Sequence, residues 1–297
     1  MRHTGLKIRM AVVGTLLFAF YAAAGAVVYA MYGQGAIPLV LVGSVLLIGF
    51  QYKVGKWAAL RSVGAEDMPE GGEYARLHQQ VESLSRDMGI DKPRLMIADM
   101  GVPNAFAVGR KGAGTVVVSR ELLHLLEDDE VEGVLAHELA HIANRDVVMM
   151  VLGQGIASIV GLVAQFVVLL AGDNDIADFF LAIIVGNVVQ FLVMLFVLAI
   201  SRYREYVADA DAKKHIGSGE PLARALEKIQ SSAEAQQSAR SSRSSQRGRG
   251  RGQRQQRNRD AGSDQVAALC IFNSSGGLAN LVSSHPPTEK RIEKLRS

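Results

Sequence analysis

The chain is organised around the stretch Ala136-His137-Glu138-Leu139-Ala140-His141. Acidic residues precede it at positions 128, 129, 130 and 132, where they suit the positive end of a starting helix. Apolar residues at 131, 134, 135, 139 and 142 recur at helical spacing, so one face of this helix is expected to pack inward. His137 and His141 then lie one turn apart on the same side, where both imidazoles can reach one metal ion.

Glu138 stands beside both histidines and can act as a base toward an attacking water molecule. Two histidine ligands, a third ligand elsewhere, an open position and a carboxylate base together form the arrangement of zinc peptidases. A His-Glu-x-x-His string also occurs by chance on solvated helix faces. Taken alone, the string therefore supports a metal site and an ordinary charged face about equally.

A second pair of acids favours the metal site. Glu205 and Asp209 are again one helical turn apart, and a glutamate is a usual third ligand for such a histidine pair. Asp209 is then placed to accept a hydrogen bond from the non-ligating nitrogen of a ligand histidine. The alternative is a charged helix face, on which these acids pair with nearby basic residues: Arg202, Arg204 or Lys213. The two spacings together favour one zinc ion per chain, held by His137, His141 and Glu205.

The composition points to a membrane protein. The 297 residues are 49% hydrophobic, although 21% are charged, and the apolar residues fall in blocks typical of membrane spans. A single cysteine, Cys270, excludes an intramolecular disulfide and fits a reducing compartment. Residues 240–259 hold eight arginines and no acid, so without them the net charge of +3 becomes −5. The basic balance is therefore local to one tract.

Four segments are long and apolar enough to cross a bilayer, which takes roughly 20 apolar residues per helix. They are residues 10–32, 36–52, 147–171 and 179–200. A cleaved signal peptide is the alternative for the first, but its apolar region would be only about 7–15 residues. Basic residues flank the outer ends of the first hairpin, and the loop at 172–178 is acidic without lysine or arginine. The positive-inside rule then places both termini in the cytoplasm.

The remaining segments are expected to form a cytoplasmic domain. Residues 74–88 have helical spacing, and three short extended segments follow at 94–98, 104–108 and 115–119. They predict a small sheet beside the zinc helix, whose free edge could bind an extended peptide as an added strand; a purely structural hairpin is the alternative. The segment 231–263 is rich in serine, arginine, glutamine and glycine and is expected to be disordered.

The domain organisation that follows has four parts. They are a first transmembrane hairpin (1–52), a first catalytic part with the zinc helix (53–146), a second transmembrane hairpin (147–200) and a second catalytic part with the disordered insert (201–297). Because the second hairpin separates the histidine pair from Glu205, both ligand sets return to the same side of the bilayer. The zinc site is expected at the cytoplasmic membrane surface.

Several motifs occur in one order: His137-Glu138-Leu139-Ala140-His141 with Asn144-Arg145-Asp146, then Ser201-Arg202 with Glu205 and Ala208-Asp209, then His285-Pro286-Pro287. This order resembles the HtpX family of membrane zinc metalloproteases, from about residue 94 onwards. The resemblance implies a mainly α fold, with four transmembrane helices and a cytoplasmic α+β zincin-like (gluzincin) catalytic domain with a small β-sheet. It also implies His285 as a catalytic group near the site. The substrate backbone contact is implied for Asn104, Ala105, Phe106 and Ala107.

The implied activity is cleavage of membrane or misfolded proteins in membrane quality control, at the cell membrane. Two alternatives stay open: a prenyl-protein-type protease, whose relatives have more spans, and a non-catalytic membrane adaptor with a structural zinc. A structural site needs no base and normally closes with a fourth protein ligand, which disfavours the adaptor. The arginine tract 240–259 departs from the family pattern; contact with anionic lipid is expected for it, rather than with nucleic acid.

Overall fold

The computed structural model describes residues 36–172, 176–247 and 286–297. The predicted first span, His285 and most of the arginine tract lie outside them. The described chain is mainly helical with one small mixed sheet, as predicted. It divides into two compact units, one with residues up to Val54 and Val148–Tyr203, the other with Gly55–Val147 and the residues from Arg204 onwards.

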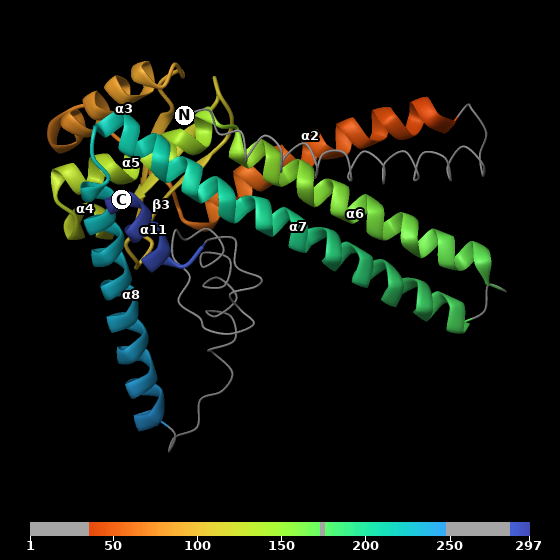
Figure 1. Cartoon of the computed structure of the whole chain (residues 1–297). Coiled ribbons are helices and arrows are strands. Elements are labelled where there is room, and N and C mark those ends of the chain that lie inside the picture. Colours follow the sequence, from red (N-terminus) through yellow and green to blue (C-terminus); the bar gives the residue numbers. More distant parts are fainter. Residues whose placement is uncertain (1–35, 173–175, 248–285) are drawn as a thin grey trace. The chain divides into compact units, whose positions relative to one another are not determined.

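The second unit is built on a four-stranded sheet with the strand order β1-β2-β4-β3. The strand β3 is labelled in Figure 1. The strands are β1 (Glu66–Asp67), β2 (Arg94–Ala98), β3 (Ala105–Val108) and β4 (Thr115–Ser119). β2 and β4 are parallel, whereas β3 pairs antiparallel with β4 and lies at one edge. The valine-rich β4 is buried along its whole length, which suits a central strand.

Alternate residues of the strands face two different cores. On one face, Leu95, Val116 and Ala105 pack with helices α3 (Ala75–Asp87) and α5 (Asp128–Ala143). On the other face, the opposite residues pack with the last turns of α2 (Ala36–Ser62); they are Met96, Phe106, Val108 and Val117. The sheet is therefore covered by the zinc helix on one side and by the end of α2 on the other.

Ion pairs and a glycine fix the zinc helix α5 against its neighbours. Glu130 is fully buried and accepts hydrogen bonds from the Glu127 backbone at 2.9 Å and from Lys228 Nζ at 2.8 Å. Lys228 belongs to α8 (Glu220–Arg247). A Cβ on Gly133 would lie 2.9 Å from the backbone nitrogen of Leu222 in α8. Only glycine permits this close approach of α5 and α8.

The other described elements complete the second unit. They are the short helices η1 (Gly72–Tyr74) and α4 (Arg120–Leu125), and the C-terminal α11 (Thr288–Arg296). Helix α8 continues to Arg247, so the segment predicted to be disordered from residue 231 begins as helix. Its alanine, glutamate and glutamine residues are good helix formers, and helix propensity was underestimated there.

The first unit contains the apolar helices. α6 (Asp146–Ala171) and α7 (Ile176–Ile216) start or end in the second unit, but pack together inside the first. A Cβ on Gly153 would lie 3.0 Å from Val197, and one on Gly161 would lie 2.9 Å from the Gly186 carbonyl. Small residues thus allow close packing of the two helices. Among the described residues, α7 is the one helix that is long and apolar enough to cross a membrane.

The packing of α5 on α8 gives the first test. Gly133→Ala should lower the unfolding temperature of the detergent-solubilised protein, because overpacking of a well-filled contact costs about 1–3 kcal/mol. Gly55→Ala is the matched control, since a Cβ at Gly55 in α2 meets nothing within 4 Å. The control should be neutral or slightly stabilising. Equal unfolding temperatures for the two variants would show that α5 and α8 do not depend on this contact.

Candidate metal centre

Two helices bring the candidate ligands together. His137 and His141 lie on α5, and Glu205 lies on α7, so residues far apart in the sequence meet in one buried cluster. The two Nε2 atoms are 3.1 Å apart. Glu205 Oε2 lies 3.5 Å from His137 Nε2, and Glu205 Oε1 lies 3.5 Å from His141 Nε2. The ligand atoms of the three residues all lie within 4.8 Å of one another.

These separations fit a tetrahedral zinc ion. With metal–ligand bonds of about 2.0–2.1 Å, two ligand atoms of a tetrahedron stand roughly 3.3–3.4 Å apart. The three observed separations, 3.1, 3.5 and 3.5 Å, bracket that value. Two imidazoles and one carboxylate also match the donor set of catalytic zinc sites, which keep a fourth position for water or substrate. The residues present therefore fit zinc.

Each histidine has a carboxylate on its other ring nitrogen. Asp209 Oδ1 lies 3.0 Å from His137 Nδ1, and Asp146 Oδ2 lies 2.6 Å from His141 Nδ1. A neutral imidazole donates from Nδ1 to such a carboxylate, which leaves the Nε2 lone pair directed at the metal position. The carboxylates thus orient both candidate ligands.

The carboxylates are themselves held by buried arginines. Arg291 of α11 is only 1% exposed and donates to Asp209 Oδ2 from Nε at 2.9 Å and to Oδ1 from Nη2 at 2.7 Å. Its Nη1 lies 3.3 Å from Glu205 Oε2. Arg204 Nη2 lies 2.5 Å from Asp146 Oδ1 and its Nη1 donates to the Asp146 carbonyl at 3.0 Å. Two cations thus partly neutralise the buried acids.

The pKa values reflect this network. Burial and Arg291 lower the pKa of His137, but Asp209 and Glu205 outweigh them and raise it to about 9. Burial also lowers the pKa of His141, yet the bond to Asp146 gives a net increase. For Asp209, burial alone would raise the pKa, but Arg291 and His137 hold it below its usual range. Asp209 is therefore a carboxylate at neutral pH.

Glu138 is buried between the metal cluster and the sheet. Burial raises the pKa of its carboxyl, although both neighbouring imidazoles and a hydrogen bond from the Ala107 backbone act in the opposite direction. Ala107 belongs to the edge strand β3, which packs against α5. The predicted base and the predicted substrate-contact segment are thus in direct contact.

The predicted segment 104–107 has a clear orientation. The Asn104 carbonyl accepts a hydrogen bond from Ser119 N at 2.8 Å, so Asn104 and Phe106 direct their backbone groups toward β4. Ala105 and Ala107 direct theirs toward the open edge. The Phe106 side chain packs on the sheet face away from the metal cluster. Any substrate contact from this segment therefore uses backbone atoms.

Some residues of the site were not predicted from sequence. Asp146 was noted as part of a motif, but its contact with His141 was not anticipated. Arg291 was not singled out from the sequence, although it is buried in the structure. A signal was present, since Thr288, Arg291 and Leu295 recur at helical spacing and form the buried face of α11.

Glu205 and Asp209 are buried and therefore do not lie on a solvated helix face. Two of the basic residues considered as their partners have other contacts: Arg204 pairs with Asp146, and Lys213 donates to the Leu295 carbonyl at 3.0 Å. A cavity of about 300 Å³ near the start of α5, lined by residues such as Tyr74, Arg120 and Val131, contains none of the metal-cluster residues. The chemistry is therefore expected at the cluster and not at that cavity.

Comparison with known proteins agrees with this geometry. The model of peptidase family M48 matches residues 72–297, which include every residue of the cluster. The chain belongs to peptidase family M48. It is 67% identical to a protease HtpX homolog of Halobacterium salinarum, with 97% of this chain and 100% of that protein aligned. It is 35% identical to the protease HtpX of Pectobacterium atrosepticum, with 82% of this chain and 80% of that protein aligned.

These matches confirm the predicted HtpX family, the metalloprotease class and zinc as its cofactor. A crystal structure of Ste24p from S. mikatae has a similar fold, with a TM-score of 0.56 and 20% identity. That alignment covers 97% of this chain and 63% of the solved chain. This M48 chain thus has a fold related to that of the solved chain, and it spans less than two thirds of that chain's length.

The carboxylate–histidine contacts predict a graded loss of zinc affinity. Asp209→Asn and Asp146→Asn should each weaken zinc binding by roughly 10–100-fold, because the ligand imidazoles lose their orienting partners. Competition with a chromophoric chelator measures the dissociation constants. Asp211→Asn, on the same helix but bonded to Asn144 at 3.0 Å, is the matched control and should leave affinity unchanged. Unchanged affinity in both site variants would mean that these contacts do not hold the ligands.

Proposed function

We propose that this M48 metalloprotease is a zinc endopeptidase that hydrolyses peptide bonds of membrane or misfolded proteins at the cytoplasmic membrane surface. The observation that carries the proposal is the position of Glu138. It is buried beside both candidate zinc ligands and bonded to the backbone of an edge strand. A base, a metal site and a place for an extended peptide are thus adjacent.

The roles of the residues follow from their contacts. His137, His141 and Glu205 would hold zinc, which supplies a Lewis acid and lowers the pKa of water toward neutrality. Glu138 would take a proton from the attacking water and deliver it to the leaving amine nitrogen. Its raised pKa suits both steps, because a general acid–base works best with a pKa near the operating pH. Asp209 and Asp146 would keep the imidazoles oriented throughout.

The substrate would bind as an added strand. β3 lies at the edge of the sheet, and Ala105 and Ala107 present backbone groups there. An extended peptide paired with this edge would pass next to Glu138, since the Ala107 amide already contacts the Glu138 carboxylate. Selection of an extended, unfolded segment is what a protease of misfolded proteins requires. His285 remains a candidate donor to the tetrahedral oxyanion.

The cytoplasmic, four-span topology is part of the same proposal. The apolar surface of α7 supports one span: its exposed apolar residues include Phe180, Ile184, Val188 and Phe191, which recur at three- and four-residue spacing. The acidic loop at 172–178 and the basic residues after 200 support the orientation. The other three spans rest on sequence alone.

The role of Glu138 can be tested by removing its charge. Glu138→Gln should keep one zinc per chain while cleavage of a casein-type substrate falls by at least about 100-fold, because general acid–base catalysis is lost. Glu132→Gln, on the same helix but outside the site, is the control and should cleave normally. Normal turnover by Glu138→Gln would exclude this residue as the base. Zinc without cleavage in the wild type would favour a non-catalytic adaptor.

Binding of the substrate as a strand predicts a two-residue period. Variants of a peptide substrate are synthesised, each methylated at one backbone nitrogen. The value of kcat/KM is then measured for each variant. Methylation should reduce kcat/KM strongly at alternate positions near the scissile bond, because only every second amide faces β3. Losses without this alternation would contradict strand pairing at Ala105 and Ala107.

A further inference from the structure

The C-terminal end of α2 carries an exposed indole, which follows a stripe of exposed apolar residues on the same helix. Trp57 is 61% exposed and is the single tryptophan of the sequence. Val42, Leu46, Phe50 and Val54 are also exposed and precede it at a spacing of three to four residues. They therefore share one face of the helix. The guanidinium of Arg61, one turn later, lies 5.5 Å from the centroid of the indole ring.

A tight basic turn lies beside this end of α2. The turn joins β3 to β4 and is closed by a hydrogen bond from Ala113 N to the Arg110 carbonyl at 2.8 Å. Gly109 and Gly112 have φ angles of 113° and 82°, which side chains rarely adopt. Arg110 and Lys111 are exposed at its tip.

The turn and the part of α2 from Gly55 onwards belong to the same compact unit. Lys56 Nζ donates to the Ala113 carbonyl at 3.0 Å, which ties α2 directly to the turn. Leu60 of α2 and Val63, just after the helix, also pack on the sheet face formed in part by Phe106 and Val108. The cations of α2 and the turn therefore keep fixed relative positions. We name this set the basal cationic surface: Lys56, Arg61, Arg110 and Lys111.

Acids compensate this charge only in part. Asp67 is engaged by Arg94, and the nearby Asp91 lies 3.4 Å from the position of a Cβ on Gly112. Burial is the larger cause that lowers the pKa of Lys56, and the neighbouring Arg94 adds to it. An anionic partner would pair with the exposed cations of this surface.

We propose that the basal cationic surface binds anionic phospholipid headgroups of the bilayer, with Trp57 at the boundary between headgroups and acyl chains. Charge complementarity and continuity with the exposed apolar stripe of α2 select this occupant. Tryptophan followed by arginine is typical of the membrane interface, where the ring lies among headgroups and the cation meets phosphate. The proposal does not involve the tract 240–259 and extends the proposed function.

Lipid binding at this surface would also place the edge strand β3, where the substrate is proposed to bind. β3 leads directly into the turn that carries Arg110 and Lys111. Lipid contact by this turn would hold the open edge of β3 beside the bilayer. An unfolded segment that emerges from the membrane would then meet the strand before it meets solvent.

The single tryptophan allows a direct test with the full chain. The protein is reconstituted at low salt in nanodiscs of phosphatidylcholine and phosphatidylglycerol, in which one lipid or the other carries bromine on its acyl chains. Quenching of Trp57 fluorescence then reports which lipid surrounds the indole. We expect phosphatidylglycerol to be enriched about threefold over its bulk fraction near Trp57, because several cations attract it. High salt should reduce this enrichment.

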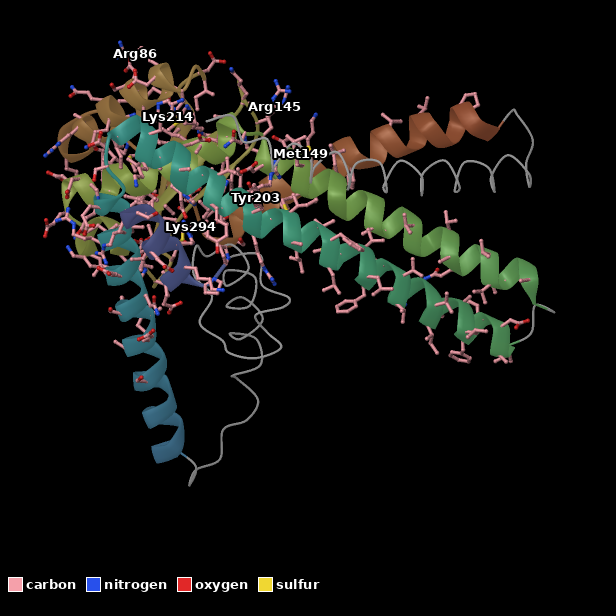
Figure 2. The ribbon with its side chains drawn as sticks, viewed as in Figure 1. Arg86, Arg145, Met149, Tyr203, Lys214 and Lys294 are labelled. Atoms are coloured by element: carbon pink, nitrogen blue, oxygen red, sulfur yellow. The ribbon has the colours of Figure 1, made fainter. Side chains whose placement is uncertain are left out.

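Matched variants identify the cations responsible. Arg110→Gln/Lys111→Gln should bring the enrichment close to the bulk fraction. Arg86→Gln/Lys214→Gln removes the same charge from α3 and the end of α7, at residues labelled in Figure 2, and should keep it. Zinc content of one per chain verifies that both variants are folded.

Three results would overturn the proposal. They are quenching of Trp57 by aqueous iodide but not by brominated lipid, equal quenching by the two brominated lipids, and an enrichment that survives Arg110→Gln/Lys111→Gln. The first result would show that Trp57 lies in water and not in the lipid interface. Because the readout is fluorescence, it is independent of whether the protein cleaves casein, and the proposed function can fail separately.

Discussion

The buried contacts between carboxylates and imidazoles are the constraint on which the site depends. His137 and His141 can present Nε2 to one ion only if their other nitrogens are occupied, and Asp209 and Asp146 occupy them. Burying these acids is costly without compensation. Arg291 and Arg204 supply it, so each carboxylate lies between an imidazole and a guanidinium. The metal cluster is thus the centre of a larger polar network inside an apolar domain.

The apolar framework places this network. Gly133 allows the close approach of α8 to α5, and the buried Glu130 links the start of α5 to Lys228. On the side of the sheet, α5 packs against Leu95 and Val116. β3 then contributes both a core residue, Ala105, and a backbone contact to Glu138 from Ala107. The base is therefore positioned by the same strand that is proposed to receive the substrate.

Sequence reasoning predicted the parts of the fold that depend on the spacing of residues along one helix or strand. The helix with His137 and His141, the strands near 94–98 and 115–119, and the convergence with Glu205 all rest on local spacing. Arg291 was not predicted, because charged residues in a polar helix usually face solvent and only tertiary contacts show that this one does not. The helical start of the segment after 231 was missed because its composition resembles a disordered tract. The contact between Asp146 and His141 depends on the direction that the chain takes after α5. The spacing of residues in the sequence does not predict that direction.

The buried position of Arg291 has a consequence for biosynthesis. Translation proceeds from the amino end, so α5 and α7 leave the ribosome well before α11 does. Until Arg291 has emerged, Asp209 lacks the cation that neutralises it, and the side of the cluster next to Glu205 is open. The nascent chain therefore holds both histidines and the glutamate without the network that orders them. The polar network around the candidate ligands is therefore complete only once the C-terminal helix α11 has been made.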